Sequence, residues 1–177
     1  KSYISSIRIG CRELGQQVES KREAAGIWFR SDRNLEPDGT GPYIDMLGGE
    51  FLTHKAQVGV GCCNQDAEHA ANLHLGEKFD VFDEIYLFKN FHRDRVHGLL
   101  WLDKHPNDGY PGDFPISWCK EFGRGRVFYT ALGHRIDVWD ANPELRGRKN
   151  APAVSRAYQQ HILGGIKWAL GLVPGDG

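Results

Sequence analysis

The chain has 177 residues, of which 40% are apolar and 25% are charged, and its formal net charge at pH 7 is −1. This length is typical of one domain with a buried core, and the composition is typical of a globular protein. The balanced charge gives no reason to expect nucleic acid or an anionic membrane surface as a partner, and no apolar run approaches the roughly 20 residues that a membrane span needs.

The first part of the chain predicts a helix, a short strand and a loop. Apolar residues at alternating spacings of three and four line one face of a helix over residues 4–18. Residues 24–29 (AAGIWF) indicate a buried strand, and residues 30–42, rich in charge, Gly and Pro, indicate a loop. The chain begins at Lys1 without a Met or the apolar stretch of a signal peptide, so we expect a processed or trimmed end.

The middle of the chain predicts one helical turn and several short strands. Tyr43 to Leu47 is typical of a single turn that Gly48 and Gly49 close. The strands are expected over residues 58–61, 79–89 and 96–102. Polar loops are expected over residues 64–76 and 103–114.

The last part predicts a β-hairpin and a closing helix. Residues 116–122 and 126–132 are strand-like, and Gly123-Arg124-Gly125 supplies the turn. The segment from Val127 to Leu132 has no clearly polar face, so we expect it to be covered on both sides. Apolar residues from Val154 to Ala169 share one helix face, on which Gly164 and Gly165 predict close packing against the sheet. These elements together favour an α/β sandwich with a mixed sheet.

His134 is the first candidate site residue. It follows the buried strand at once, after a Gly133 that permits a sharp turn. In open α/β sheets, ligands bind just beyond the carboxyl ends of strands, and a histidine there can act as acid, base or metal ligand. The alternative is a turn histidine that caps local backbone groups; we favour the functional interpretation.

Glu84 is the second candidate. The pair Asp83-Glu84 lies inside an otherwise apolar segment, and adjacent strand residues point to opposite faces, so only one of them can face a given site. A buried acid needs a partner or a function. Glu84 would be an acid/base group or an acceptor for a sugar hydroxyl, with Tyr86 on the same face. A structural salt bridge at a strand end is an equal alternative.

His54 is a candidate only if it approaches His134. The segment GGEFLTH that ends in His54 has no phosphate-loop or dinucleotide-binding spacing. Histidine and carboxylate ligands together could hold a metal, but the sequence has no HExxH or His-x-His pairing. We therefore expect no cofactor and keep a metal as a lesser alternative.

The four cysteines predict structural thiols. Cys62 and Cys63 are adjacent and Cys11 and Cys119 stand alone, so no CxxC spacing for zinc or redox chemistry occurs. Neither Cys119 nor the Cys62-Cys63 pair lies at the kind of strand-to-helix turn that presents the nucleophile of a cysteine hydrolase, so we do not expect thiol catalysis.

Aromatic residues near loops and strand ends are candidates for stacking on a sugar ring. They are Trp118, Trp139, Tyr43 and Tyr110. The alternative for each is a core position. His92 and His97 are expected at the surface or packed on a strand.

Several segments together resemble the ThuA-like family, which is named for trehalose utilisation. They are PISWCKEFGRGRVFYTALGH, the VWD that follows it, and QQHILGGIKWALGL. DEIYLFKNF is similar to the family's D-E-x-Y segment and PYIDMLGGEFLTH to its G-G-x-F-x-x-H segment. GCCNQDAEHAANLHLGEKF is similar to a stretch that usually carries a His-Pro pair, although Ala70 follows His69 here. These matches cover most of residues 42–174, and we expect one ThuA-like domain over residues 1–177.

The resemblance implies a fold like that of the class I glutamine amidotransferases, a flavodoxin-like three-layer α/β sandwich with the amidotransferase cysteine lost. It also implies a bacterial role in the catabolism of disaccharides and glycosides, including 3-keto-sugars made by an oxidoreductase of the same pathway. A cytoplasmic location is expected, with a periplasmic or secreted one left open. The positions that match the family are His54, Glu84, Tyr86, Trp118, Tyr129 and His134.

The chain departs from the family before residue 42. Members usually place a strand, a helix and a Gly-rich strand ending in G-I-H between the first helix and the G-G-x-F segment. Here the loop-like residues 30–41 occupy that place, and the first strand, expected before Lys1, is absent. We therefore expect residues 1–41 to be truncated or gapped, so that part of the N-terminal half of the fold is lacking.

The leading hypothesis is an enzyme that processes a disaccharide, glucoside or 3-keto-glucoside by acid/base chemistry, of hydrolase, lyase or isomerase type. The expected catalytic residues are His134, Glu84 and His54. The expected substrate-binding residues are Tyr86, Trp118, Tyr129 and Trp139. A non-catalytic carbohydrate-binding or accessory domain and a metal-dependent hydrolase stay as alternatives, and a homo-oligomer stays open.

Overall fold

The computed structural model describes residues 41–177. The helix predicted over residues 4–18, the strand over 24–29 and most of the loop over 30–42 lie outside this range. The described helices and strands, in chain order, are α1 (Pro42–Leu47), β1 (Glu50–His54), β2 (Val58–Asn64), β3 (Lys78–Asp83), β4 (Tyr86–Lys89), η1 (Arg93–Arg95), β5 (His97–Lys104), β6 (Pro111–Phe122), β7 (Gly125–Thr130), α2 (Ile136–Trp139) and α3 (Pro152–Ala169).

The strands form two antiparallel sheets. The larger has five strands in the order β3-β2-β5-β6-β7, and the smaller pairs β1 with β4. Every strand pair within residues 41–177 is antiparallel, so the expectation of a mixed sheet is wrong for this range. Hairpin and loop connections join strands in opposite directions, whereas a parallel pair needs a crossover, which the sequence does not place between these strands.

The segment over residues 79–89 is two strands rather than the single strand expected. β3 ends at Asp83 and joins the larger sheet, while β4 begins at Tyr86 and pairs with β1. The turn between them holds Glu84 and the buried Ile85. The chain changes sheets at this turn, and the acidic pair lies at the change.

The hairpin and the closing helix are confirmed, with shifted ends. β6 and β7 pair across the Gly123–Arg124 turn, and β7 ends at Thr130 rather than at Leu132. The loop expected over 103–114 shrinks to residues 105–110, because β5 and β6 are longer than the apolar pattern indicates. The short helix α2 was not expected from the sequence.

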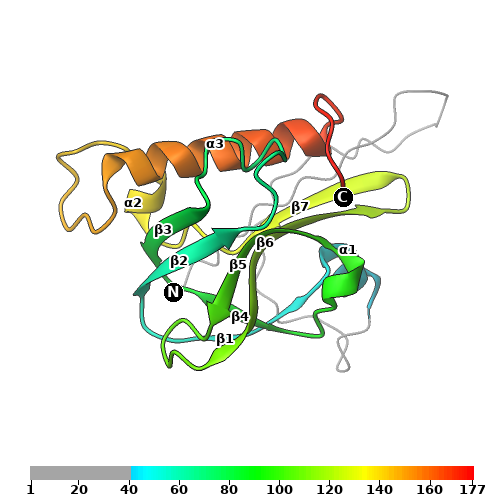
Figure 1. Ribbon diagram of the computed structural model, residues 1–177, viewed down its shortest axis with the longest axis horizontal. Coiled ribbons are helices and arrows are strands. Elements are labelled where there is room, and N and C mark those ends of the chain that lie inside the picture. The colour runs from blue at the N-terminus through cyan, green and yellow to red at the C-terminus, as the bar shows by residue number, and fades with distance from the viewer. Residues whose placement is uncertain (1–40) are drawn as a thin grey trace.

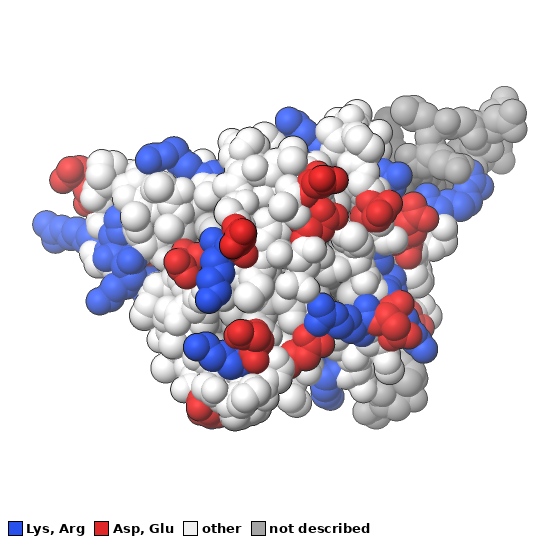
Figure 2. All heavy atoms as spheres, viewed as in Figure 1, with Lys and Arg blue, Asp and Glu red and all other residues white. Residues whose placement is uncertain are grey.

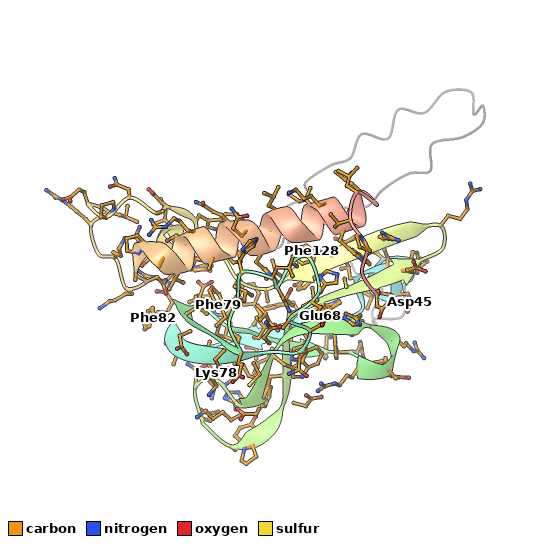
Figure 3. The ribbon with its side chains drawn as sticks, turned by 45° about the horizontal axis from the view of Figure 1, so that its top comes forward. Asp45, Glu68, Lys78, Phe79, Phe82 and Phe128 are labelled. Carbon is orange, nitrogen blue, oxygen red and sulfur yellow. The ribbon has the colours of Figure 1, made fainter. Side chains whose placement is uncertain are left out.

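The main core lies between α3 and the larger sheet (Figure 1). Phe128 packs beneath α3, where the helix approaches closely (Figure 3). A Cβ atom built on Gly164 would lie 2.1 Å from the carbonyl oxygen of Ala70, and one built on Gly165 would lie 2.5 Å from the ring of Phe128. The close helix-to-sheet packing predicted from these two glycines is confirmed.

A second, aromatic cluster fills the space on the other side of the larger sheet. Trp118 and Tyr129 face each other across β6 and β7, with ring centroids 4.2 Å apart and an angle of 16° between the rings. Phe88 of β4 packs edge-on against both rings. The order of layers is therefore α3, the five-stranded sheet, and the β1–β4 pair (Figure 1). Helices on both faces, as in flavodoxin-like folds, remain a prediction.

Acidic and basic side chains are interspersed on the face shown in Figure 2, in keeping with the net charge of −1. Within residues 41–177, no helix is long and apolar enough to cross a membrane.

Candidate active site

Three of the residues predicted from the sequence meet at one carboxylate oxygen. The Nδ1 atom of His54 lies 3.3 Å from Oε1 of Glu84, and the Nδ1 atom of His134 lies 3.5 Å from the same oxygen. Tyr86 joins the group through its hydroxyl, which lies 3.5 Å from Nδ1 of His134. The spatial condition that made His54 a candidate is therefore met.

The β1–β4 pairing brings His54 to the site. His54 is the last residue of β1 and lies opposite Tyr86, the first residue of β4, in the antiparallel register. Glu84 precedes Tyr86 by two residues, so the end of β1 faces the turn that carries Glu84. The ring of Tyr86 is buried and packs edge-on against Phe51 at 5.1 Å between centroids. The small sheet thus holds one wall of the site.

Asp83 brings His134 to the site, and the sequence interpretation did not assign it this role. Its side chain is fully buried and accepts backbone N–H groups from the loop after β7. Oδ2 accepts from Gly133 at 2.7 Å and from His134 at 3.2 Å, and Oδ1 accepts from Arg135 at 2.9 Å. Burial raises the pKa of Asp83, and these amide donors oppose the rise because they favour the carboxylate.

Asp83 and Glu84 point in different directions, as expected of adjacent residues at a strand end. Asp83 holds the backbone of the loop, and Glu84 contacts the imidazoles of His54 and His134. The sequence does carry a signal for Asp83, as an acid in an apolar run. Because adjacent strand residues point to opposite faces, however, the pattern assigns only one of the two acids to the site.

The contacts of His54 fix which nitrogen carries its proton. Nδ1 faces two acceptors, the carbonyl oxygen of Lys55 at 3.2 Å and Oε1 of Glu84 at 3.3 Å. Two acceptors require a donor between them, so Nδ1 carries the hydrogen. Nε2 is then the atom with the free lone pair in neutral His54, whose side chain is 38% exposed. A histidine in this state can accept a proton from a ligand.

Glu84 has a buried carboxylate oxygen that can accept a further hydrogen bond. Its side chain is 12% exposed, and Oε1 is buried without a well-aligned hydrogen bond among the described residues. A buried carboxylate oxygen that lacks a good donor costs free energy, and such costs are typical of functional positions. A hydrogen bond from either imidazole would become stronger when that imidazole is protonated.

The aromatic candidates lie at different depths. Trp118 is fully buried, and its Nε1 donates to the carbonyl oxygen of Leu47 at 2.8 Å. Tyr129 is 4% exposed and stacks on Trp118. Both rings therefore lie beneath the β1–β4 pair, with no free face for a sugar in this conformation. Trp139 is half-buried, and its Nε1 donates to the carbonyl oxygen of Gly133 at 2.7 Å, beside His134.

Cys119 has a histidine neighbour but the wrong chemistry for a nucleophile. Its Sγ lies 3.7 Å from Nε2 of His69 and 3.4 Å from the carbonyl oxygen of Asp176. Nδ1 of His69 accepts the backbone N–H of Ala71, so Nε2 carries the proton of the neutral ring and cannot act as a base toward the thiol. Burial raises the pKa of the Cys119 thiol and lowers that of His69 to about 4.

Within the part of the chain that the structure describes, no group of three or more His, Cys, Asp or Glu side chains is arranged to hold a metal ion. His97, expected at the surface or packed on a strand, is half-buried and pairs with Asp66 at 2.8 Å.

Comparison with known proteins gives one family and one solved structure. The family model described as trehalose utilisation, ThuA, matches residues 34–169. A crystal structure of a protein from Parabacteroides merdae, described as ThuA-like, is 20% identical, with a TM-score of 0.46; the match covers 69% of this chain. This chain spans 40% of the length of that protein. A search of curated proteins gave no match. Because the family model matches residues 34–169, which is more than half of the chain, the chain belongs to the ThuA family, described by trehalose utilisation.

Proposed function

We propose that this chain acts on a disaccharide, glucoside or 3-keto-glucoside by acid/base chemistry at Glu84, His54 and His134. The observation that supports the proposal most is the approach of both imidazoles to Oε1 of Glu84, at 3.3 and 3.5 Å. These residues come from separate parts of the chain, and histidine and glutamate are the side chains that most often serve in general acid/base catalysis. The family's description by trehalose utilisation agrees with a sugar substrate.

His54 would serve as the base. Its Nδ1 hydrogen is held by the carbonyl oxygen of Lys55, with Oε1 of Glu84 3.3 Å from the same nitrogen, which leaves Nε2 to take a proton from the substrate. The Glu84 carboxylate would then stabilise the imidazolium that forms, as an acid behind a catalytic histidine does. His134, whose side chain is 21% exposed and whose Nδ1 lies 3.5 Å from the Tyr86 hydroxyl, would deliver a proton to the departing oxygen.

A 3-keto-glucoside suits such a pair of groups. The proton on carbon 2 is acidic because it lies next to the carbonyl of carbon 3, and the base can remove it to leave an enolate. The enolate then expels the oxygen on carbon 1, which takes a proton from the acid. The products are an alcohol and an unsaturated keto-sugar with a double bond between carbons 1 and 2. Each step of general acid/base catalysis contributes roughly 10²–10⁴-fold.

The aromatic residues would contribute at two levels. Trp139 flanks His134 and is proposed to contact the sugar, whereas the buried Tyr86 would act through its hydroxyl, which lies 3.5 Å from Nδ1 of His134. Trp118 and Tyr129, being buried, would support the wall formed by β1 and β4 rather than stack on the sugar directly. A 3-keto substrate also requires a partner oxidoreductase that oxidises the hydroxyl on carbon 3. We further propose a flavodoxin-like, amidotransferase-like arrangement of layers for the family domain.

The test is incubation of the chain with a methyl 3-keto-glucoside in deuterated water, followed by proton NMR. The proposal expects exchange of the carbon-2 proton for deuterium in the remaining substrate and release of methanol, both faster than in a protein-free sample. His54→Gln and His134→Gln should each lose most of the rate, whereas His74→Gln, at an exposed histidine, should keep it. Full rates in both site variants would overturn the assignment.

Calorimetry separates the alternative of a non-catalytic carbohydrate-binding domain from the proposed enzyme. Saturable binding of glucosides with neither exchange nor release, over long incubation, would select a non-catalytic carbohydrate-binding domain and contradict the proposed chemistry.

A further inference from the structure

A hollow lies at the end of the β1–β4 pair that is opposite to Glu84. Glu50 is paired with Lys89 at this end, whereas His54 is paired with Tyr86 at the end that carries Glu84. The hollow encloses about 140 Å³ between α1, the segment after β4 and the end of β6. Four residues of extended strand separate the two ends, which is roughly 13 Å. The hollow is therefore distinct from the candidate active site.

Three of the eight residues that line the hollow are basic. Arg95, Lys120 and His92 contribute side chains to it, and Asp45 is the one acidic residue among its described lining residues. The Arg95 side chain makes no ion pair within residues 41–177. Lys120 donates from Nζ to the backbone carbonyl of Asp45 at 2.8 Å, which leaves two of its hydrogens for another acceptor.

The positive charges of Arg95 and Lys120 repel each other. Burial lowers the pKa of Lys120, the Asp45 carboxylate opposes this, and Arg95 adds to the lowering. Two positive groups that face one space with a single carboxylate among its described lining residues are stabilised by a bound anion. Arg95 offers a planar fork of N–H donors, and Lys120 offers a compact charge, a combination that suits the several oxygens of a phosphoryl group.

The backbone around the hollow is unusual. Asn90, which lines it, has a φ of 50° and is the one non-glycine residue with positive φ among residues 41–177. Its side chain is tied down, because Nδ2 donates to Oε2 of Glu50 at 2.9 Å. Gly48, on the wall, has a φ of 89° as the C-cap of α1. A positive φ at a non-glycine residue such as Asn90 persists where surrounding contacts impose it, and such residues cluster at ligand sites.

We propose that this hollow binds a phosphoryl group, with Arg95 and Lys120 as its ligands. Phe122 lines the same hollow and is 40% exposed, so an organic moiety attached to the phosphate could pack on its ring. This site is independent of the chemistry proposed at Glu84 and would be present whether or not the chain is an enzyme.

The experiment is a titration of the full chain with inorganic phosphate, followed by heteronuclear NMR at constant ionic strength set with chloride. Saturable shifts at Asn90, Arg95 and Lys120 are expected. Arg95→Gln and Lys120→Gln should each weaken the affinity at least about tenfold, the effect of losing one charged hydrogen bond. Lys104→Gln removes an exposed cation that does not line the hollow and should leave the affinity unchanged.

A comparison of two ligands, inorganic phosphate and glucose 6-phosphate, identifies the source of the phosphate. Glucose 6-phosphate that binds more tightly than inorganic phosphate assigns the hollow to a phosphorylated organic ligand, and equal affinities assign it to free phosphate. Linear, non-saturating shifts in the unsubstituted chain would overturn the proposal. An equal loss of affinity in Lys104→Gln would overturn it too, because general screening would then account for the binding.

Discussion

The carboxylate of Asp83 accepts the backbone N–H of Gly133 at 2.7 Å, across 50 residues of sequence. This contact joins the end of β3 to the loop after β7, and the same carboxylate oxygen accepts the N–H of His134. The backbone of His134 is therefore held by Asp83, the residue that precedes Glu84 in the chain. The adjacent Glu84 contacts the His134 imidazole.

Replacing Asp83 with Asn should destabilise the chain and displace His134. An amide has one accepting oxygen, and its NH₂ group would face backbone donors, so buried N–H groups lose their partner. The expected loss in the free energy of unfolding is about 2–4 kcal/mol. Urea denaturation measures it. Asp80→Asn, an exposed position on the same strand, should change the stability by less than about 0.5 kcal/mol. Equal stabilities for the two variants would show that the Asp83 contacts contribute nothing.

Glu84→Gln should separate activity from stability. Oε1 of Glu84 is buried without a well-aligned hydrogen bond, so a neutral side chain of the same shape should keep the stability or raise it by about 1 kcal/mol. The turnover of a 3-keto-glucoside should fall by roughly 10²–10⁴-fold, because the imidazolium of His54 loses its counter-charge. Thermal unfolding and NMR turnover measure the two effects, and Glu77→Gln, at an exposed glutamate, is the control. A large loss of stability would assign Glu84 to the structural role that the sequence left open.

Gly164→Ala should damage the packing of α3. The added Cβ would lie 2.1 Å from the carbonyl oxygen of Ala70, a distance that only movement of the backbone can relieve. We expect a loss of about 2–4 kcal/mol despite the higher helix propensity of Ala. Gly76→Ala is the matched control, since its nearest atom beyond its chain neighbours, the carbonyl oxygen of Lys78, would be 3.8 Å away. Denaturant midpoints compare the variants, and a stable Gly164→Ala would mean that helix and sheet are not held as described.

The stability of the chain should fall as the pH drops from 7 to 5. Burial lowers the pKa of both His69 and His161 to about 4, whereas an unfolded histidine has a pKa near 6.5. A lowered pKa means that the unfolded state binds protons first. The contribution of each histidine is therefore complete above about pH 6.5 and is lost as the pH falls toward 4. Between pH 7 and 5 the loss should be about 2 kcal/mol for each histidine.

The variant His161→Gln tests this assignment. It should be less stable at pH 7, because the ring fills a buried site next to Ser117, but its stability should change about 2 kcal/mol less between pH 7 and 5. His74→Gln, at an exposed histidine, should show the full pH dependence of the unsubstituted chain. If His161→Gln kept the full dependence, other groups would have to account for it.

The local sequence pattern was sufficient to predict the elements that depend on residues close together in the chain. The closing helix, the β6–β7 hairpin and the close packing at Gly164 were predicted because each is governed by contacts or turn residues near in sequence. The division of residues 79–89 between two sheets was not predicted, since an apolar run shows no boundary when both of its halves are buried. The antiparallel arrangement of the larger sheet could not be predicted from the sequence either, because the relative direction of two strands depends on which strands become neighbours.

The same division holds for the candidate site. The sequence by itself determined which residues are candidates for the site: a histidine after a buried strand, an acid inside an apolar run, and a second histidine after a Gly pair. Only the tertiary structure decided that His54 and His134 share one oxygen of Glu84 and that Asp83 holds the loop of His134. It also placed Trp118 beneath the site instead of in it. The physical reason is that residue type fixes what a side chain can do, whereas distance and burial depend on strand pairing and on contacts between distant segments.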